Sequence, residues 1–223
     1  MFISESNRIL TLNKWALKLL DSELSEVMKR RLNASSPTIP ISCVEEALIR
    51  AYSGMVAYTL NDFLRGKVPE YIEYKASCLY NHSNFLRTIQ KLPLYSSEKP
   101  LYRGTKIRKE TLTRMQKNGF YTDFAFISTS TDKITPSGQG GAMWHLRADL
   151  NNYPEEDYDL VLLTILKHTS GRDISLYSAD SDTDGTEILF MPNTKFSIKN
   201  TKINKQHARD ILEIDVEEVS NIV

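Results

Sequence analysis

The sequence has few cysteines, no long apolar run and no excess of charge of either sign, and each absence excludes a class of protein. Its two cysteines, Cys43 and Cys78, are too few for a disulfide framework or a zinc ligand set. Eighteen consecutive apolar residues occur nowhere, so no segment is predicted to span a membrane. The 28 basic residues balance the 28 acidic ones, which does not favour binding to a nucleic-acid backbone. The 223 residues, 41% of them hydrophobic, are sufficient for one domain with a buried core.

The first part of the chain is predicted to be helical. Apolar residues recur three or four apart along residues 9–32, which is typical of an amphipathic helix rather than of a signal peptide. A second helix is predicted to begin at Ser42, because Glu45 completes a capping-box pattern, and to run to Gly66. A third helix is predicted to end before Pro93. We therefore predict a helical lobe over residues 1–95.

After Pro100 the pattern changes to short apolar or alternating runs that are separated by turn residues. These runs predict strands at 101–104, 124–130, 160–167, 187–191, 196–198 and 211–216. The intervals leave room for helices only at about 108–117 and 139–150. We predict an α+β fold in a single domain, 1–223, in which the helical lobe is followed by a mainly antiparallel β core over 96–223.

Three short segments carry polar residues where a sheet would prefer apolar ones. They are Tyr-Arg-Gly at 102–104, Phe-Ile-Ser-Thr-Ser at 126–130 and Gly-Thr-Glu-Ile-Leu-Phe at 185–190. Each alone has an ordinary structural interpretation, as an edge-strand arginine, as solvated hydroxyls or as a surface glutamate. Their occurrence in this order, each on a predicted strand, favours a shared function.

Together the three segments resemble the arginine, serine-threonine-serine and glutamate motifs of the ADP-ribosyltransferase exoenzyme family. This R-S-E class includes bacterial toxins and the vertebrate arginine-specific transferases. Residues 51–66 and 171–178 are also similar to family segments, so that the resemblance covers roughly residues 44–200. It implies a mono-ADP-ribosyltransferase whose β-rich core, 96–223, binds NAD as its substrate and uses no metal.

The resemblance implies that Arg103, Ser128 and Glu187 are catalytic. It implies six residues that bind NAD: Arg103, Gly104, Ser128, Thr129, Ser130 and Glu187. Cleavage of the nicotinamide–ribose bond builds positive charge at the anomeric carbon, which the Glu187 carboxylate would stabilise. Ser128 would orient Glu187, and the guanidinium of Arg103 suits the pyrophosphate or a nearby ribose. Gly104 would let the backbone approach the nicotinamide amide.

One position departs from the family pattern. Arginine-specific members usually carry a second glutamate two residues before the catalytic one, and other acceptor classes carry glutamine, whereas this sequence has Gly185. A guanidinium stays protonated at neutral pH, so its use as a nucleophile needs a nearby base, which glycine does not supply. Asp184 or Asp182 could substitute, although strand alternation turns residue 184 away from the face of 185 and 187.

The sequence therefore leaves the acceptor open. Our leading hypothesis is transfer of ADP-ribose to a protein side chain, with arginine as one candidate, by a secreted effector or toxin. The alternatives are an NAD glycohydrolase and a catalytically inactive NAD-binding interaction module. We expect a protein acceptor, no nucleic acid and no membrane partner; neither the acceptor nor any immunity or host activator protein is identified. Without a classical signal peptide, the protein is expected to reach the cytosol of a host or target cell by another route, or otherwise to be cytoplasmic.

Overall fold

The computed structural model describes residues 21–31, 41–53, 57–67, 72–134, 142–147, 154–177, 186–205 and 209–219. The chain divides into two compact units. The helical unit consists of Met1–Pro93 with Leu176–Ser181, and the β unit consists of Leu94–Ser175 with Asp182–Val223.

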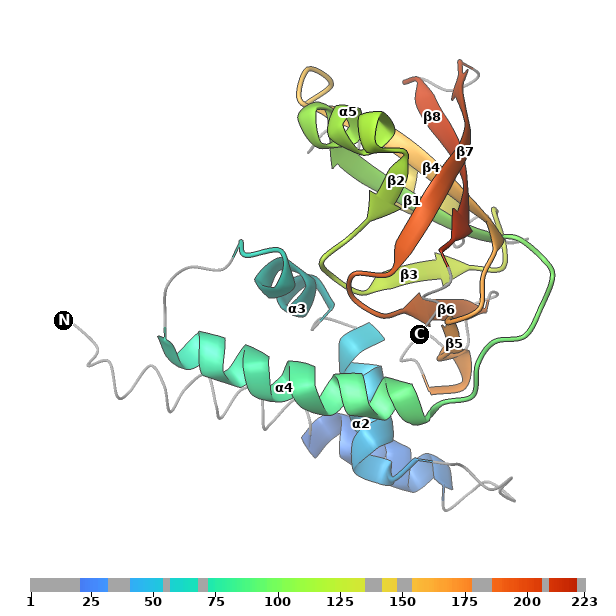
Figure 1. The fold of residues 1–223 in the computed structure, drawn as a ribbon. Helices are drawn as coiled ribbons and strands as arrows, with labels where there is room; N and C mark the ends of the chain where they lie inside the picture. The colour runs from blue at the N-terminus through green and yellow to red at the C-terminus, as the bar shows by residue number, and fades with distance from the viewer. Residues whose placement is uncertain are drawn as a thin grey trace. The chain divides into compact units, whose positions relative to one another are not determined.

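The helical unit contains a helix over 21–31, α2 (Cys43–Ala51), α3 (Ala57–Leu64) and α4 (Ile72–Lys91) (Figure 1). The predicted start of α2 is confirmed, because Ser42 and Glu45 form a full capping box. The backbone N–H of Ser42 donates to Glu45 Oε2 at 2.9 Å, and the backbone N–H of Glu45 donates to Ser42 Oγ at 3.3 Å. Phe85 on α4 is buried, and its ring stacks on the ring of Tyr52, the residue that follows α2, with 4.3 Å between the ring centroids.

The predicted single helix from 42 to 66 was wrong, since the structure has two helices there. The backbone widens to a π-helical turn at Tyr52 and Ser53, directly before a glycine, and both serine and glycine have low helix propensity. The long first helix is confirmed over 21–31, and the rest of its predicted span lies outside the described residues. The third helix is confirmed as α4.

The β unit contains one eight-stranded sheet in the order β2-β7-β8-β4-β1-β3-β6-β5. Its strands are β1 (Leu101–Arg108), β2 (Phe120–Thr122), β3 (Ile127–Ser130), β4 (Tyr158–Lys167), β5 (Arg172–Asp173), β6 (Glu187–Phe190), β7 (Lys195–Asn204) and β8 (Ile211–Glu218). Its helices are α5 (Lys109–Asn118) and α6 (Ala142–Arg147), with a 3-10 turn at Ser175–Tyr177. All the named strand pairs are antiparallel except β4 with β8, so the predicted α+β fold with a mainly antiparallel sheet is confirmed.

Several strand bounds differ from the predicted ones for local reasons. β1 runs four residues past Gly104 because it pairs with β4 along its whole length, from Leu101–Ile165 to Arg108–Tyr158. Residues 124–126 form a bend before β3 instead of the first half of a strand. β2 and β5 were missed, since three and two residues are too few to show an alternating pattern.

The sheet has two parts that meet at one position. β1 and β3 share a single register pair, Tyr102 with Ser130, whereas β1 and β4 pair over eight positions. Figure 1 shows β3, β6 and β5 as a separate group beside the longer strands β1, β4, β7 and β8. We call this pair the β1–β3 junction; it joins a larger part, β2-β7-β8-β4-β1, to a smaller part, β3-β6-β5.

Both faces of the sheet near the junction are packed. One face carries an apolar cluster that extends from the larger part into the smaller one and includes Leu101, Leu163, Ile127, Ile188 and Phe190. On the other face, α6 packs Ala142, Met143 and Leu146 against Leu160 and Leu162. The continuity of the first cluster holds the two parts of the sheet together where backbone pairing is sparse.

One carboxylate of the sheet is buried among basic and amide groups. Glu213 on β8 is 8% exposed and accepts from Asn204 Nδ2 at 2.9 Å, while Lys202 Nζ and Lys133 Nζ lie 2.9 and 3.3 Å from its oxygens. The hydrogen bond from Asn204, followed by those from the two lysines, lowers the pKa of Glu213 from 4.5 to about 2. Lys133 lies three residues after the end of β3, so its ion pair with Glu213 connects the segment after β3 to β8 in the larger part of the sheet.

Because the pKa of Glu213 is lowered in the folded state, its contribution to stability is complete above pH 4.5 and is lost as the pH falls toward 2. At full strength the shift corresponds to about 3 kcal/mol, at about 1.4 kcal/mol per pKa unit. In urea unfolding, Glu213→Gln should lower the free energy of unfolding at pH 6 and approach the wild type as the pH falls to 3. The control Glu110→Gln changes a side chain that is 79% exposed and should show no such trend. A Glu213→Gln deficit that does not change with pH would contradict this role.

Candidate active site

The three residues predicted to be catalytic come together at the β1–β3 junction. Ser128 Oγ on β3 donates to Glu187 Oε1 on β6 at 2.5 Å. Arg103 Nη1 on β1 donates to the backbone carbonyl of Ser128 at 2.8 Å. Residues that are 25 and 59 positions apart in the sequence are thus linked by two hydrogen bonds.

Strand register explains the contact between Ser128 and Glu187. Ser130 pairs with Glu187 and Ser128 pairs with Leu189, and paired residues of antiparallel strands share a face. Ser128 and Glu187 are therefore diagonal neighbours on one face. A distance of 2.5 Å is typical of a hydroxyl that donates to an ionised carboxylate, so this bond holds the carboxylate in one orientation.

Arg103 is held at the junction but leaves a polar atom unsatisfied. Its side chain is 15% exposed, and its Nη2 lies 4.0 Å from Oδ2 of Asp123, which is equally buried. Its Nε is buried and has no hydrogen-bond partner within the described part of the chain. An unsatisfied buried donor is uncommon in proteins, and this one belongs to a guanidinium that is permanently charged.

The other two hydroxyls of the serine-threonine-serine motif bond within the protein. Thr129 is 3% exposed, lies on the opposite face from Ser128, and donates to the backbone carbonyl of Ile188 at 2.8 Å. Ser130 Oγ accepts from the backbone N–H of Asp132 at 3.0 Å and so shapes the turn after β3. Thr129 would have to leave its buried position to contact a ligand, whereas Ser130 shares the face of Glu187.

The glycine after Arg103 has a packing reason. A Cβ at Gly104 would lie 1.9 Å from the backbone oxygen of Ala142 and 2.9 Å from Leu146 Cγ. α6 therefore crosses β1 at a distance that only glycine permits. This contact with α6 gives the glycine a structural reason, and the approach of its backbone to nicotinamide stays a prediction.

Two further residues at the site were not predicted from the sequence. Asp123 faces Arg103, and Ser175 Oγ accepts the backbone N–H of Glu187 at 2.7 Å. An aspartate two residues before a serine, as in Asp173 and Ser175, is typical of an Asx turn, and this pattern could have drawn attention to the segment. Gly185, Asp184 and Asp182 lie outside the described residues.

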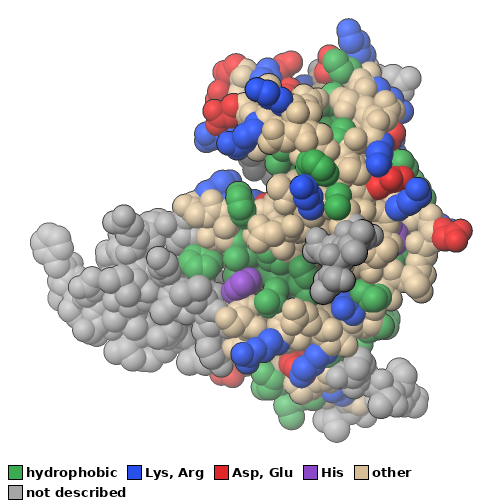
Figure 2. Space-filling view, viewed as in Figure 1, with side chains coloured by type: hydrophobic (Ala, Val, Ile, Leu, Met, Phe, Trp, Pro, Cys, Tyr) green, Lys and Arg blue, Asp and Glu red, His purple; other side chains and the backbone are tan. Residues whose placement is uncertain are grey.

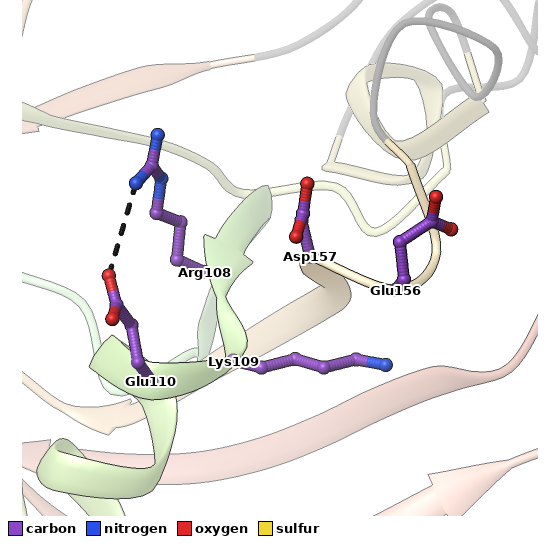
Figure 3. Close-up of a pocket in the computed structure, with 5 residues that line it drawn as sticks. All are labelled: Arg108, Lys109, Glu110, Glu156 and Asp157. Atoms are coloured by element: carbon purple, nitrogen blue, oxygen red, sulfur yellow. Dashed lines mark ion pairs between the residues drawn. The ribbon is translucent and has the colours of Figure 1, made fainter.

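A pocket of about 340 Å³ lies at the other end of β1 and is lined by Arg108, Lys109, Glu110, Glu156 and Asp157 (Figure 3). Arg108, which lines this pocket, is five residues along β1 from Arg103, a distance of roughly 16 Å at the rise of a β-strand. Figure 2 shows basic and acidic side chains side by side around α5. Because both signs of charge line this pocket, it does not select an anion, and we place the candidate site at the junction.

Within the described ranges, no helix is long and apolar enough to cross a membrane. Among the same residues, no group of three or more His, Cys, Asp or Glu side chains is arranged to hold a metal ion.

Comparisons with known proteins point to one fold family. No protein-family model matches the sequence. A curated relative, the NAD(+)–protein-arginine ADP-ribosyltransferase Tre1 of Pseudomonas putida, is 27% identical over 139 residues, which are 62% of this chain and 22% of the relative. The chain thus matches about a fifth of the length of that relative.

Solved structures match over most of the chain. The Vis toxin, an ADP-ribosyltransferase from Vibrio splendidus, has a TM-score of 0.64 at 20% identity, with 93% of this chain and 86% of that one covered. A structure of Vis in complex with agmatine gives a TM-score of 0.65 at 21% identity, with 92% and 84% covered. Plx2a, an ADP-ribosyltransferase toxin from Paenibacillus larvae, gives a TM-score of 0.56 at 17% identity, with 96% of this chain and 97% of that one covered. The predicted resemblance is confirmed: the chain has the fold of the ADP-ribosyltransferase toxins.

Gly104→Ala should destabilise the protein, because the added methyl group meets the backbone of α6 rather than a side chain that can rotate away. We expect a loss of about 3 kcal/mol, at the upper end of the usual cost of overpacking. The control Gly119→Ala places a Cβ with nothing within 4 Å, at φ +72, and should cost only about 1 kcal/mol for the left-handed backbone. Urea unfolding measures the free energy of unfolding of both variants. Equal losses of this free energy would show that α6 is not fixed against β1.

Proposed function

We propose that the protein is an NAD-dependent mono-ADP-ribosyltransferase, a glycosyltransferase that cleaves NAD and transfers ADP-ribose to a protein side chain. The observation that carries the proposal is the bond of 2.5 Å between Ser128 Oγ and Glu187 Oε1, with Arg103 bonded to the Ser128 carbonyl. The fold of the relatives and the order of the three motifs support it.

The chemistry assigns a different task to each residue. As the nicotinamide leaves with the electron pair of the glycosidic bond, positive charge grows at the anomeric carbon of the ribose. The Glu187 carboxylate, held by Ser128, stabilises that charge in place, without reorganising during the reaction. The acceptor then forms the new bond to the anomeric carbon and loses a proton.

Arg103 is assigned to the anionic part of NAD. Its guanidinium is permanently charged and offers several N–H donors, which suits the pyrophosphate oxygens. The position of Arg103 supports this role, because it bonds the carbonyl of Ser128, whose hydroxyl holds Glu187, and in NAD the pyrophosphate is joined to the ribose that Glu187 would act on.

For the acceptor we propose the guanidinium of a protein arginine. The curated relative is named as acting on protein arginine, and Vis was solved with agmatine, which carries the same guanidinium group. Because Gly185 supplies no base, another carboxylate must take the acceptor's proton, and Asp184 and Asp182 are the first candidates. The names of the structural relatives, which include toxins and a type III effector, favour a secreted protein that modifies a protein of another cell.

Gly185 also favours a second candidate function, NAD glycohydrolysis, in which water is the acceptor. Incubation with NAD labelled in its adenylate part separates the two, with agmatine added as a guanidine acceptor. A transferase forms ADP-ribosyl-agmatine or labelled protein, a glycohydrolase forms only free ADP-ribose, and an inactive NAD-binding module forms neither.

Glu187→Gln should abolish nicotinamide release while the fold and NAD binding persist, because the charge that it removes matters most in the transition state. The expected loss is at least about a hundredfold, the usual cost of one preorganised electrostatic group. The measurement pairs the rate of nicotinamide release with thermal stability, and Glu110→Gln serves as the control. A variant that keeps more than about a tenth of the rate would remove Glu187 from the chemistry.

Arg103→Lys should weaken NAD binding more than it slows the bound complex, since lysine keeps the charge but loses the planar fork. The matched control is Arg108→Lys, at the exposed end of the same strand, where the side chain is 64% exposed. Titration with NAD and measurement of the rate at saturation distinguish the two effects. If Arg103→Lys binds NAD like the wild type, Arg103 serves only to hold the junction.

A further inference from the structure

The strand that carries Glu187 begins in an unusual way. In an ordinary antiparallel ladder, two paired residues exchange both backbone hydrogen bonds. Directly after the end of β5, the backbone N–H of Ile174 donates to the carbonyl of Glu187 at 3.0 Å. The N–H of Glu187, however, donates to the side-chain Oγ of Ser175 at 2.7 Å. A hydroxyl thus takes the place of the last backbone acceptor of the ladder.

Ser175 is itself fixed from the preceding strand. The backbone N–H of Ser175 donates to Oδ1 of Asp173 at 3.0 Å, and the chain then enters the 3-10 turn Ser175–Tyr177. Its hydroxyl also lies 3.4 Å from the carbonyl oxygen of Glu187, so it contacts both polar atoms of that residue's backbone.

We propose that Ser175 is a positioning residue that fixes the backbone of Glu187 so that its carboxylate meets Ser128. This inference rests on the proposed function and adds a residue that none of the three motifs contains. Glu187 is the first residue of β6, and the ends of strands open more readily than their centres. Ser128 holds the carboxylate and Ser175 holds the backbone, so both ends of the glutamate are restrained.

The cost of losing the backbone restraint follows from geometry. Reacting groups must be held within about 0.5 Å of their productive positions, and a displacement of about 1 Å can cost a hundredfold in rate. Ser175→Ala leaves the N–H of Glu187 without its acceptor and allows the start of β6 to shift. The effect should appear in the chemical step, because Arg103, which is assigned to NAD, is on a different strand.

The test compares Ser175→Ala and Ser175→Thr with Ser197→Ala. Ser197 is a matched control, since it is half-buried in the same sheet and its hydroxyl bonds across strands to the Glu217 carbonyl at 3.3 Å, away from the junction. We expect Ser175→Ala to lower kcat for nicotinamide release roughly tenfold with an almost unchanged KM for NAD. Ser175→Thr, which keeps the hydroxyl, should recover most of the rate, and Ser197→Ala should keep the wild-type rate.

A second measurement does not depend on activity. Amide hydrogen exchange at Glu187 should become at least about tenfold faster in Ser175→Ala but not in Ser197→Ala, because the N–H has lost its acceptor. Wild-type kcat in Ser175→Ala overturns the inference while leaving the proposed function intact. If the wild type does not release nicotinamide, the proposed function fails, and the exchange rate alone decides whether Ser175 fixes Glu187. Unchanged exchange in Ser175→Ala overturns the inference in either case.

Discussion

The structure of the site depends on the β1–β3 junction, where two parts of one sheet meet through a single pair of residues. The Tyr102–Ser130 pair is reinforced by the bond from Arg103 to the Ser128 carbonyl, so a side chain contributes to a connection that backbone ladders make elsewhere in the sheet. The same arginine is the cation proposed to bind NAD. One residue would therefore both hold the two parts of the sheet together and supply the cation for NAD.

Alternation along β3 divides the serine-threonine-serine motif between two tasks. Ser128 faces the carboxylate, whereas Thr129 points into the core and bonds the backbone of β6. The buried threonine bond fixes the register that makes Ser128 a diagonal neighbour of Glu187. Three small polar residues in a row thus specify both the position of the neighbouring strand and the orientation of the side chain that it carries.

The sequence predicted what depends on local pattern or on chemical type. The capping box at Ser42 lies within four residues of the chain, and the arginine, serine and glutamate were identified by residue type and by the order of their motifs; hydrogen bonds link all three in the structure. The partner of Gly104 could not be predicted, because Ala142 is distant in the sequence and only packing brings it close. Ser175 was missed because a serine two residues after a two-residue strand belongs to no periodic pattern. Its bond to Glu187 exists only once β6 lies beside it.

The smaller part of the sheet ends in an antiparallel pair, β5 with β6. After the 3-10 turn at Ser175–Tyr177, the connection between these strands continues through residues 178–186 to Glu187. Because the two strands are neighbours, the ends of this connection stay close together whatever its length, and each doubling of a loop costs only about 0.6 kcal/mol. Evolution can lengthen, shorten or rewrite the segment without disturbing the pairing that holds Glu187. Changes of sequence in this connection can therefore accumulate while Ser128 and Glu187 remain hydrogen-bonded to each other.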